Sequence, residues 1–117
     1  MKVVAFITDL GFQAAVAKIA RKAGADLTIV TSLYKFIPVL PTGPALVVID
    51  LEAQGISGPA LVSQVKSFDK AIAVVACASK GRSDLLEQAK RSGADQVLSH
   101  AEFREGLPGI LESAGAE

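Results

Sequence analysis

Residues 47–61, which read VVIDLEAQGISGPAL, contain the signals that decide the fold of this chain. The residues before Asp50 form an uninterrupted apolar run, which is typical of a strand buried on both faces of a parallel sheet. After the run, Ser57 precedes Gly58-Pro59. Serine is a common N-cap residue and proline is common in the first turn of a helix. The stretch therefore predicts a buried strand, a short loop and a helix in succession.

The same alternation of short apolar segments and helical segments extends in both directions from this stretch. Strands are expected at residues 3–7, 27–30, 45–49, 71–76 and 96–98. In the segments between them apolar residues recur three or four positions apart, as on the buried face of a helix. Gly24 and Gly93 stand where left-handed residues end helices, and Ser99 precedes Glu102 at the spacing of a capping box. Only residues 32–40 are weak: we expect a stunted helix there, and a proline-containing loop at 41–44.

Five strands joined by helices favour parallel pairing, because right-handed crossovers place the helices on both faces of one sheet. We therefore predict an α/β fold, a three-layer α/β/α sandwich. Its five-stranded parallel sheet is expected in the flavodoxin-like order 2-1-3-4-5. Residues 1–117 are expected to form a single domain, because this length suits one core.

Composition narrows the class of function. The chain has 12 basic and 12 acidic side chains, so its formal net charge is zero, which argues against non-specific nucleic-acid binding. One cysteine excludes an internal disulfide and fits a reducing compartment. The apolar run at the start is too short for a signal peptide or a membrane span. We therefore expect a cytoplasmic protein with no nucleic-acid or membrane partner.

Polar residues follow the strands at the edge of the sheet where open α/β proteins bind ligands. They are Thr8-Asp9, Asp50, the segment from Cys77 to Ser79, and His100. Two carboxylates on central strands can share a divalent cation, and an aspartate held in this way can accept a phosphoryl group. The alternative for Asp9 is a cap on the following helix, and for His100 a surface position at a helix start.

The chain resembles response-regulator receiver domains over nearly its whole length. Asp50 ends the third strand, Gly58 follows eight residues later, Leu61 occupies an expected core position, and Gly93-Ala94 resembles the pair before the fifth strand. The resemblance implies that Asp50 is the phosphoacceptor. It also implies that Asp9, Asp50 and the backbone carbonyl of Glu52 hold Mg²⁺.

Several positions depart from the receiver pattern, and each departure removes a group that binds or reports the phosphoryl group. The resemblance places Thr8 where an acidic residue is usual, and Ala53-Gln54 where methionine-proline is usual. It places Ala78 at the strand-four hydroxyl position, with Ser79 one residue late. In the fifth strand and just after it, Val97 is at the aromatic switch position and His100 is at the lysine position. We therefore expect weak Mg²⁺ binding and an atypical, stand-alone receiver-like domain of the pseudo-receiver kind.

Such a domain implies signalling by protein contacts rather than enzymatic catalysis, with phosphorylation of Asp50 in a two-component phosphorelay left open. The implied partners are a histidine kinase, an effector or a second copy of the chain. The usual contact surface, and a homodimer interface, is the fourth helix with the fifth strand and fifth helix. Its members here are Leu85, Lys90, Val97, Phe103 and Leu107, whose apolar side chains could equally be core.

Two rival interpretations belong to other classes. The segment from Cys77 to Ser83 resembles a rhodanese- or phosphatase-like loop, in which Cys77 would be a nucleophile of low pKa. A flavodoxin-like ligand-binding module is the other rival. It would need a hydroxyl- and glycine-rich loop after the first strand and aromatic residues against the ligand, whereas Thr8-Asp9-Leu10-Gly11-Phe12 supplies little of this.

Overall fold

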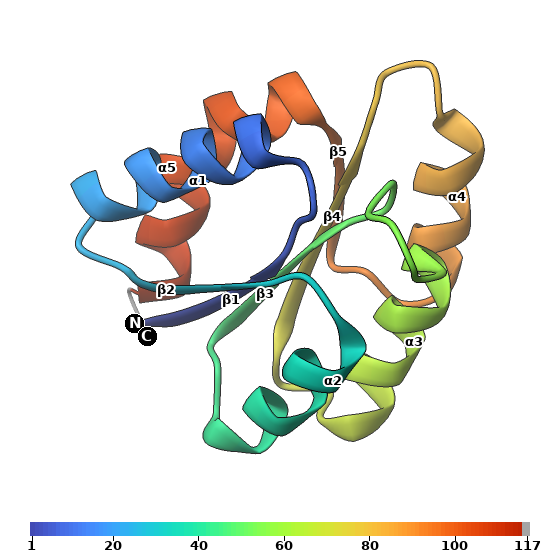
Figure 1. The fold of residues 1–117 in the computed structure, drawn as a ribbon, viewed down its shortest axis with the longest axis horizontal. Coiled ribbons are helices and arrows are strands. Elements are labelled where there is room, and N and C mark those ends of the chain that lie inside the picture. The colour runs from blue at the N-terminus through green and yellow to red at the C-terminus, as the bar shows by residue number, and fades with distance from the viewer. Residues whose placement is uncertain (116–117) are drawn as a thin grey trace.

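The computed structural model describes residues 1–115 and confirms the alternation of strands and helices (Figure 1). In chain order the elements are β1 (Lys2–Phe6), α1 (Leu10–Lys22), β2 (Asp26–Val30), α2 (Leu33–Phe36), the 3₁₀ helix η1 (Ile37–Thr42), β3 (Leu46–Asp50), α3 (Gly58–Phe68), β4 (Ala73–Ala78), α4 (Ser83–Arg91), β5 (Gln96–Ser99) and α5 (His100–Gly115). None of the described helices is both long and apolar enough to cross a membrane.

The sheet has the predicted topology. All neighbouring strands pair in parallel, and their order is β2-β1-β3-β4-β5. Helices α1 and α5 cover one face, while α2, α3 and α4 cover the other (Figure 1). The carboxyl ends of β1, β3, β4 and β5 therefore meet at one edge of a three-layer sandwich.

The central strand β3 explains why its sequence is apolar without alternation. All five of its residues are buried. Val47 and Ile49 pack under α2, α3 and α4, whereas Leu46 and Val48 pack under α1 and α5. Because side chains alternate along a strand, Asp50 continues the row that faces α1 and α5.

Helix ends follow the predicted signals. The Ser57 side chain accepts a hydrogen bond from the Ala60 N–H at the start of α3, and Gly24 has a left-handed φ of 72° after α1. Ser99 and Glu102 form the capping box: each side chain accepts the other's backbone N–H, at 3.1 and 2.9 Å. Hydrogen bonding to Ser99, chiefly to its backbone N–H, lowers the pKa of the Glu102 carboxyl below its ordinary value.

The second helix and the fourth strand differ most from the prediction. The weak second helix is one α-helical turn, but a 3₁₀ helix continues it through Pro41 to Thr42, where a loop was expected. Proline fixes φ at a value that suits such a turn. Strand β4 ends at Ala78 rather than at residue 76, because Cys77 pairs with Asp50 and Ala78 with Ser99.

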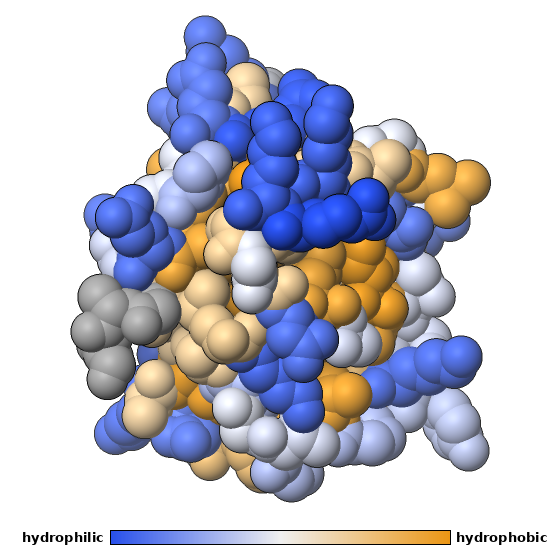
Figure 2. Space-filling model, turned by 90° about the vertical axis from the view of Figure 1, so that its left-hand side faces the viewer, coloured by the Kyte–Doolittle hydropathy of each residue, from blue (hydrophilic) through white to orange (hydrophobic). Residues whose placement is uncertain are grey.

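One edge of the sheet is partly uncovered. Strand β2 has only β1 as a neighbour, and Leu27 and Ile29 on it are half-buried. Viewed from the side of α1, α5 and this strand, hydrophobic residues show between hydrophilic ones (Figure 2). Edge strands of this kind leave backbone groups free to pair with another chain.

Candidate functional site

The carboxyl ends of the strands surround an open pocket of about 880 Å³. Four residues singled out in the sequence line it besides Asp50, namely Thr8, Asp9, Ser79 and His100, and Glu52 lines it as well. The structure therefore brings the predicted residues together from four separate segments of the chain. Two of the predicted positions, Ala78 and Val97, are not among the residues that line the pocket.

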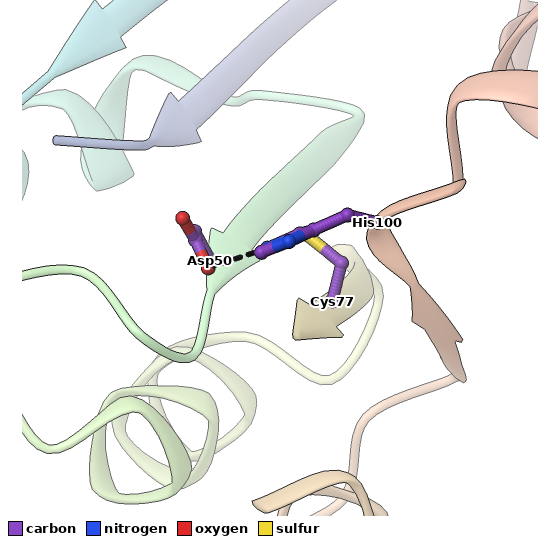
Figure 3. Close-up of side chains that lie close together, drawn as sticks. All are labelled: Asp50, Cys77 and His100. Carbon is purple, nitrogen blue, oxygen red and sulfur yellow. Dashed lines mark hydrogen bonds and ion pairs between the residues drawn. The ribbon is translucent and has the colours of Figure 1, made fainter. Parts of the chain in front are cut away.

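Asp50 lies at the end of β3 and is almost entirely buried, with 3% of its surface exposed. Its Oδ1 atom lies 3.0 Å from His100 Nε2 (Figure 3). The same atom accepts the Glu52 N–H at 3.1 Å. Because a carboxylate only accepts hydrogen bonds, the Nε2–H of His100 is the donor in this pair. The imidazole is held against the Phe12 ring, with centroids 4.6 Å apart. The pocket thus contains one carboxylate that is already engaged by a neighbouring side chain.

Asp9 serves as the N-cap of α1, which was the alternative expectation for it. Its Oδ2 atom accepts the Phe12 N–H at 2.8 Å. The side chain also lines the pocket, so capping and a place beside a bound cation are compatible. The Thr8 hydroxyl oxygen accepts the Gln54 N–H at 3.1 Å and links the loop after β1 to the loop after β3.

Ala78 and Ser79, at the end of β4, have different environments. Ala78 is fully buried and faces the layer of α2, α3 and α4. Ser79, one residue later, lines the pocket, and its backbone N–H donates to the Glu52 side chain. Hydrogen bonding to Ser79 holds the pKa of Glu52 below its ordinary value, against the opposing effect of desolvation. The Glu52 carboxylate is therefore committed to Ser79.

The apolar residues assigned to a contact surface divide into core and partly exposed positions. Phe103 and Leu107 are buried, at 0% and 1% exposure, and pack with α1 on the face opposite α4. Phe103 and Leu107 therefore belong to the core, because the apolar stripe of α5 faces the sheet. The sequence had left open whether they were core or contact residues. Leu85 and Val97 are half-buried against the other cluster, and Lys90 is exposed.

Cys77 does not have the environment that the cysteine-loop interpretation requires. Its side chain is fully buried within β4, and the thiol lies 3.8 Å from the Ile49 carbonyl oxygen. Desolvation, followed by the negative charges of Asp50 and Glu52, raises the pKa of this thiol well above its ordinary value. A nucleophile in such a loop needs a lowered pKa and access to substrate, so that interpretation is wrong.

The buried thiol predicts a specific pH dependence of stability. Above about pH 8.5 the thiol ionises in the unfolded chain but stays protonated in the folded chain. The unfolded state is then favoured by about 1.4 kcal/mol for each further pH unit. The free energy of unfolding is measured with urea for the wild type and for Cys77→Ala, at pH 8 and at pH 10. Between pH 8 and pH 10 the variant should gain stability relative to the wild type. A difference that stays constant with pH would contradict this account.

Sequence reasoning missed Arg104, which also lines the pocket. It lies four residues after His100, in the first turns of α5, and residues at this spacing share one face of a helix. The capping box at Ser99 had already fixed where this helix begins, so the spacing could have revealed it. Arg104 adds a permanent cation to a pocket that otherwise contains three carboxylates.

The residues that line the pocket give little support to the flavodoxin-like alternative. Phe12 is the only Phe, Tyr or Trp side chain that lines it, and its ring is packed against His100 and Phe103. A flavin ring needs an exposed aromatic surface to stack on, and this ring is committed to the core.

Solved structures share this architecture. The signal receiver domain of a DNA-binding response regulator (merR) from Colwellia psychrerythraea 34H superposes with a TM-score of 0.87 at 17% identity, over 100% of this chain and 99% of that one. The DrrB receiver domain activated by BeF₃ gives 0.85 at 14% identity, over 99% and 97%. NtrX from Brucella abortus, solved in complex with ADP, gives 0.85 at 21% identity, over 97% of this chain but 26% of NtrX.

The pocket and the sheet order define an open α/β domain with an aspartate at its ligand-binding edge. More closely, the fold of this chain is that of response-regulator receiver domains. The chain spans about a quarter of NtrX and nearly the whole of an isolated receiver domain. No known family model matches the sequence, and no curated protein sequence is significantly similar to it.

Proposed function

We propose that this chain is a receiver-type signalling domain that acts through contacts with a protein partner, and that Asp50 is its site of phosphoryl attachment. The observation that carries the proposal is the position of Asp50. It ends the central strand at the pocket, with Asp9 lining the same pocket and His100 on its Oδ1 atom. The domain works in the cytoplasm and is a binding module rather than an enzyme. Its partner is a histidine kinase, an effector or a second copy of the chain.

Mg²⁺ fits the residues around Asp50. The carboxylates of Asp9 and Asp50 line one pocket, and the backbone carbonyl of Glu52 is the third protein oxygen in the proposed site. Oxygen atoms are the ligands that Mg²⁺ prefers, and its charge would offset that of a bound phosphoryl group. Binding is expected to be weak, because Thr8 supplies a hydroxyl where a second acidic residue would supply a charge.

His100 and Arg104 account for how the pocket would hold a phosphoryl group without a lysine. The imidazole donates to Asp50 and stands beside the atom that would be modified. Arg104 lines the same pocket and carries a guanidinium that can form two parallel hydrogen bonds to a phosphate. The two side chains together supply the donor and the cation that one lysine supplies in a typical receiver.

Phosphoryl transfer from a small donor tests the proposal. The protein is incubated with Mg²⁺ and acetyl phosphate, and its intact mass is recorded at intervals. The expected result is one added phosphoryl group, which appears only with Mg²⁺ and is lost when the acyl phosphate is hydrolysed. A protein that acquires no added mass at saturating Mg²⁺ and donor is not a phosphoacceptor, and the proposal then fails.

Restoring the missing acidic residue should strengthen Mg²⁺ binding. Thr8→Asp adds a carboxylate that can still accept the Gln54 N–H. One more charge beside the ion is expected to raise the Mg²⁺ affinity about tenfold, or about 1.4 kcal/mol. Isothermal titration with MgCl₂ measures this, with Thr8→Asn as the matched uncharged control. Equal affinities in the two variants would show that Mg²⁺ does not bind beside residue 8.

The surface for the partner is proposed on α4, β5 and the exposed side of α5. Its exposed members include the polar residues Lys90 and Gln96, whereas Leu85 and Val97 are half-buried and Phe103 and Leu107 belong to the core. A contact through this face would therefore be of the polar, reversible kind that suits signalling.

A further inference from the structure

Three metal-ligating side chains of different chemistry meet beside the pocket. Asp50, Cys77 and His100 each offer one ligand atom, and the three atoms lie within 4.8 Å of one another (Figure 3). They come from β3, from β4 and from the start of α5. No other group of three such residues is found in residues 1–115.

The backbone holds these side chains in place. Asp50 and Cys77 are direct partners in the register of β3 and β4, so their side chains point to the same face of the sheet. They are 3% and 0% exposed, and the imidazole is packed on Phe12. Little conformational freedom would therefore be lost when an ion binds.

The spacing suits a tetrahedral ion. Zinc binds oxygen and nitrogen at about 2.0–2.2 Å and sulfur at about 2.3 Å, so neighbouring ligand atoms lie roughly 3.3–3.6 Å apart. Asp50 Oδ1 and His100 Nε2 are 3.0 Å apart, and the three ligand atoms lie within 4.8 Å. Shifts of less than about an ångström would place all three around one zinc ion.

The mixed ligand set indicates which ion would bind. Mg²⁺ takes oxygen ligands, whereas sulfur and imidazole nitrogen suit zinc and related transition metals. We infer that Asp50, Cys77 and His100 form a binding site for a zinc-type divalent transition metal. This site shares Asp50 with the Mg²⁺ site proposed above and takes its other two ligands, a thiolate and an imidazole, from different residues. The pocket gives access and leaves room for water as a fourth ligand, because Asp50 and His100 line it. Three protein ligands and one open position is a known zinc arrangement.

Charge balance explains how a buried thiol could act as a metal ligand. When the metal binds, the S–H bond of Cys77 breaks, its proton leaves to solvent, and the sulfur electron pair forms the bond to the metal. The ring proton of His100 moves from Nε2 to Nδ1 by exchange with solvent, so the imidazole stays neutral and the Nε2 lone pair binds the metal. The thiolate and the Asp50 carboxylate together carry two negative charges, which equal the charge of the ion. The occupied site is then neutral, which suits a position with so little exposure.

Two titrations test the inference on the folded protein. Zn²⁺ affinity is measured by calorimetry, and Co²⁺ is added as a spectroscopic substitute whose bond to a thiolate gives a charge-transfer absorption. We expect binding of one ion and a thiolate band. We also expect Cys77→Ala to abolish the band and to weaken Zn²⁺ binding. Loss of a residue that only supports a metal ligand weakens binding by about 10–100-fold, and loss of the Cys77 ligand itself should weaken it more. His100→Gln, at a partly exposed position, should weaken Zn²⁺ binding similarly without disturbing the core.

Asp9→Asn distinguishes this site from the proposed Mg²⁺ site, and asparagine remains a good N-cap for α1. We expect this variant to lose Mg²⁺ binding and to keep the thiolate band with Co²⁺. Equal Zn²⁺ affinity in the wild type and Cys77→Ala, or a Co²⁺ complex without a thiolate band, would overturn the inference. So would Zn²⁺ binding that disappears in Asp9→Asn, since the ion would then lie among the acidic residues. Phosphoryl transfer to Asp50 is tested separately, on the wild type with Mg²⁺ and acetyl phosphate, and that proposal fails if no mass is added whatever the outcome with Zn²⁺.

Discussion

Asp50→Asn is expected to abolish the adduct that the protein forms with beryllofluoride and Mg²⁺. Beryllofluoride mimics a phosphoryl group by bonding to a carboxylate oxygen, and an amide offers no equivalent oxygen. The substitution is otherwise mild, because the amide oxygen can still accept the hydrogen bonds from the Glu52 N–H and His100. Fluorine NMR measures the result as the loss of the protein-bound signals while the free signals remain.

The matched control for this substitution is Asp26→Asn. Asp26 is exposed at the start of β2, at the end of the sheet opposite the pocket. The bound fluorine signals should be unchanged in this variant. Bound signals that persist in Asp50→Asn would place the adduct on another carboxylate, with Asp9 and Glu52 as the remaining ones in the pocket.

Gly58→Ala is expected to destabilise the protein, because the added methyl group would overlap the backbone of Leu51. A Cβ atom at residue 58 would lie 2.7 Å from Leu51 Cα and 2.8 Å from Leu51 Cδ2. Backbone atoms cannot move aside as a flexible side chain can, so α3 or the loop after β3 must shift. We expect a cost of about 1–3 kcal/mol in the free energy of unfolding, as for other overpacked sites. The midpoint of urea unfolding measures it.

Gly109→Ala is the control, because it adds the same methyl group at a position where no other atom lies near the added carbon. Residue 109 lies within α5, and a Cβ atom there would have no neighbour within 4 Å. Alanine should therefore stabilise the protein by about 0.8–1.0 kcal/mol through helix propensity. Opposite signs at positions 58 and 109 are the expected outcome. A stabilised Gly58→Ala would show that α3 does not begin against Leu51.

The Gly58 contact also explains a sequence signal. The spacing between Asp50 and Gly58 supported the resemblance to receiver domains without a physical reason. The structure supplies one: α3 begins against the backbone of Leu51, directly after Asp50, and only glycine fits there. The sheet order followed from right-handed crossovers, and most helix ends followed from capping residues. The meeting of Asp9, Asp50 and His100 followed from the strand ends, because parallel strands bring their carboxyl ends to one edge.

Other features of the site could not be read from the sequence because they depend on contacts between distant segments. The bond from the Gln54 N–H to Thr8 joins residues 46 positions apart, and it gives the departure at Thr8 a structural role. The register that sets Cys77 opposite Asp50 depends on how β3 and β4 align, which an apolar run does not specify. For the same reason Cys77 was considered as a loop residue, although it lies within the strand.

The contact between His100 and Asp50 ties the end of β3 to the start of α5. The imidazole is held against Phe12 and contacts Asp50 directly. A phosphoryl group on Asp50 would have to displace or reorient the imidazole, which couples the pocket to the helix at the proposed contact face.

Amide NMR of the ¹⁵N-labelled protein, with and without Mg²⁺ and beryllofluoride, tests the central claim most directly. If Asp50 is the phosphoryl site of a signalling domain, amide signals should move around residues 8–12, 51–54 and 79, and continue into β5 and the first turns of α5. A spectrum that stays unchanged at saturating Mg²⁺ and beryllofluoride would contradict the account.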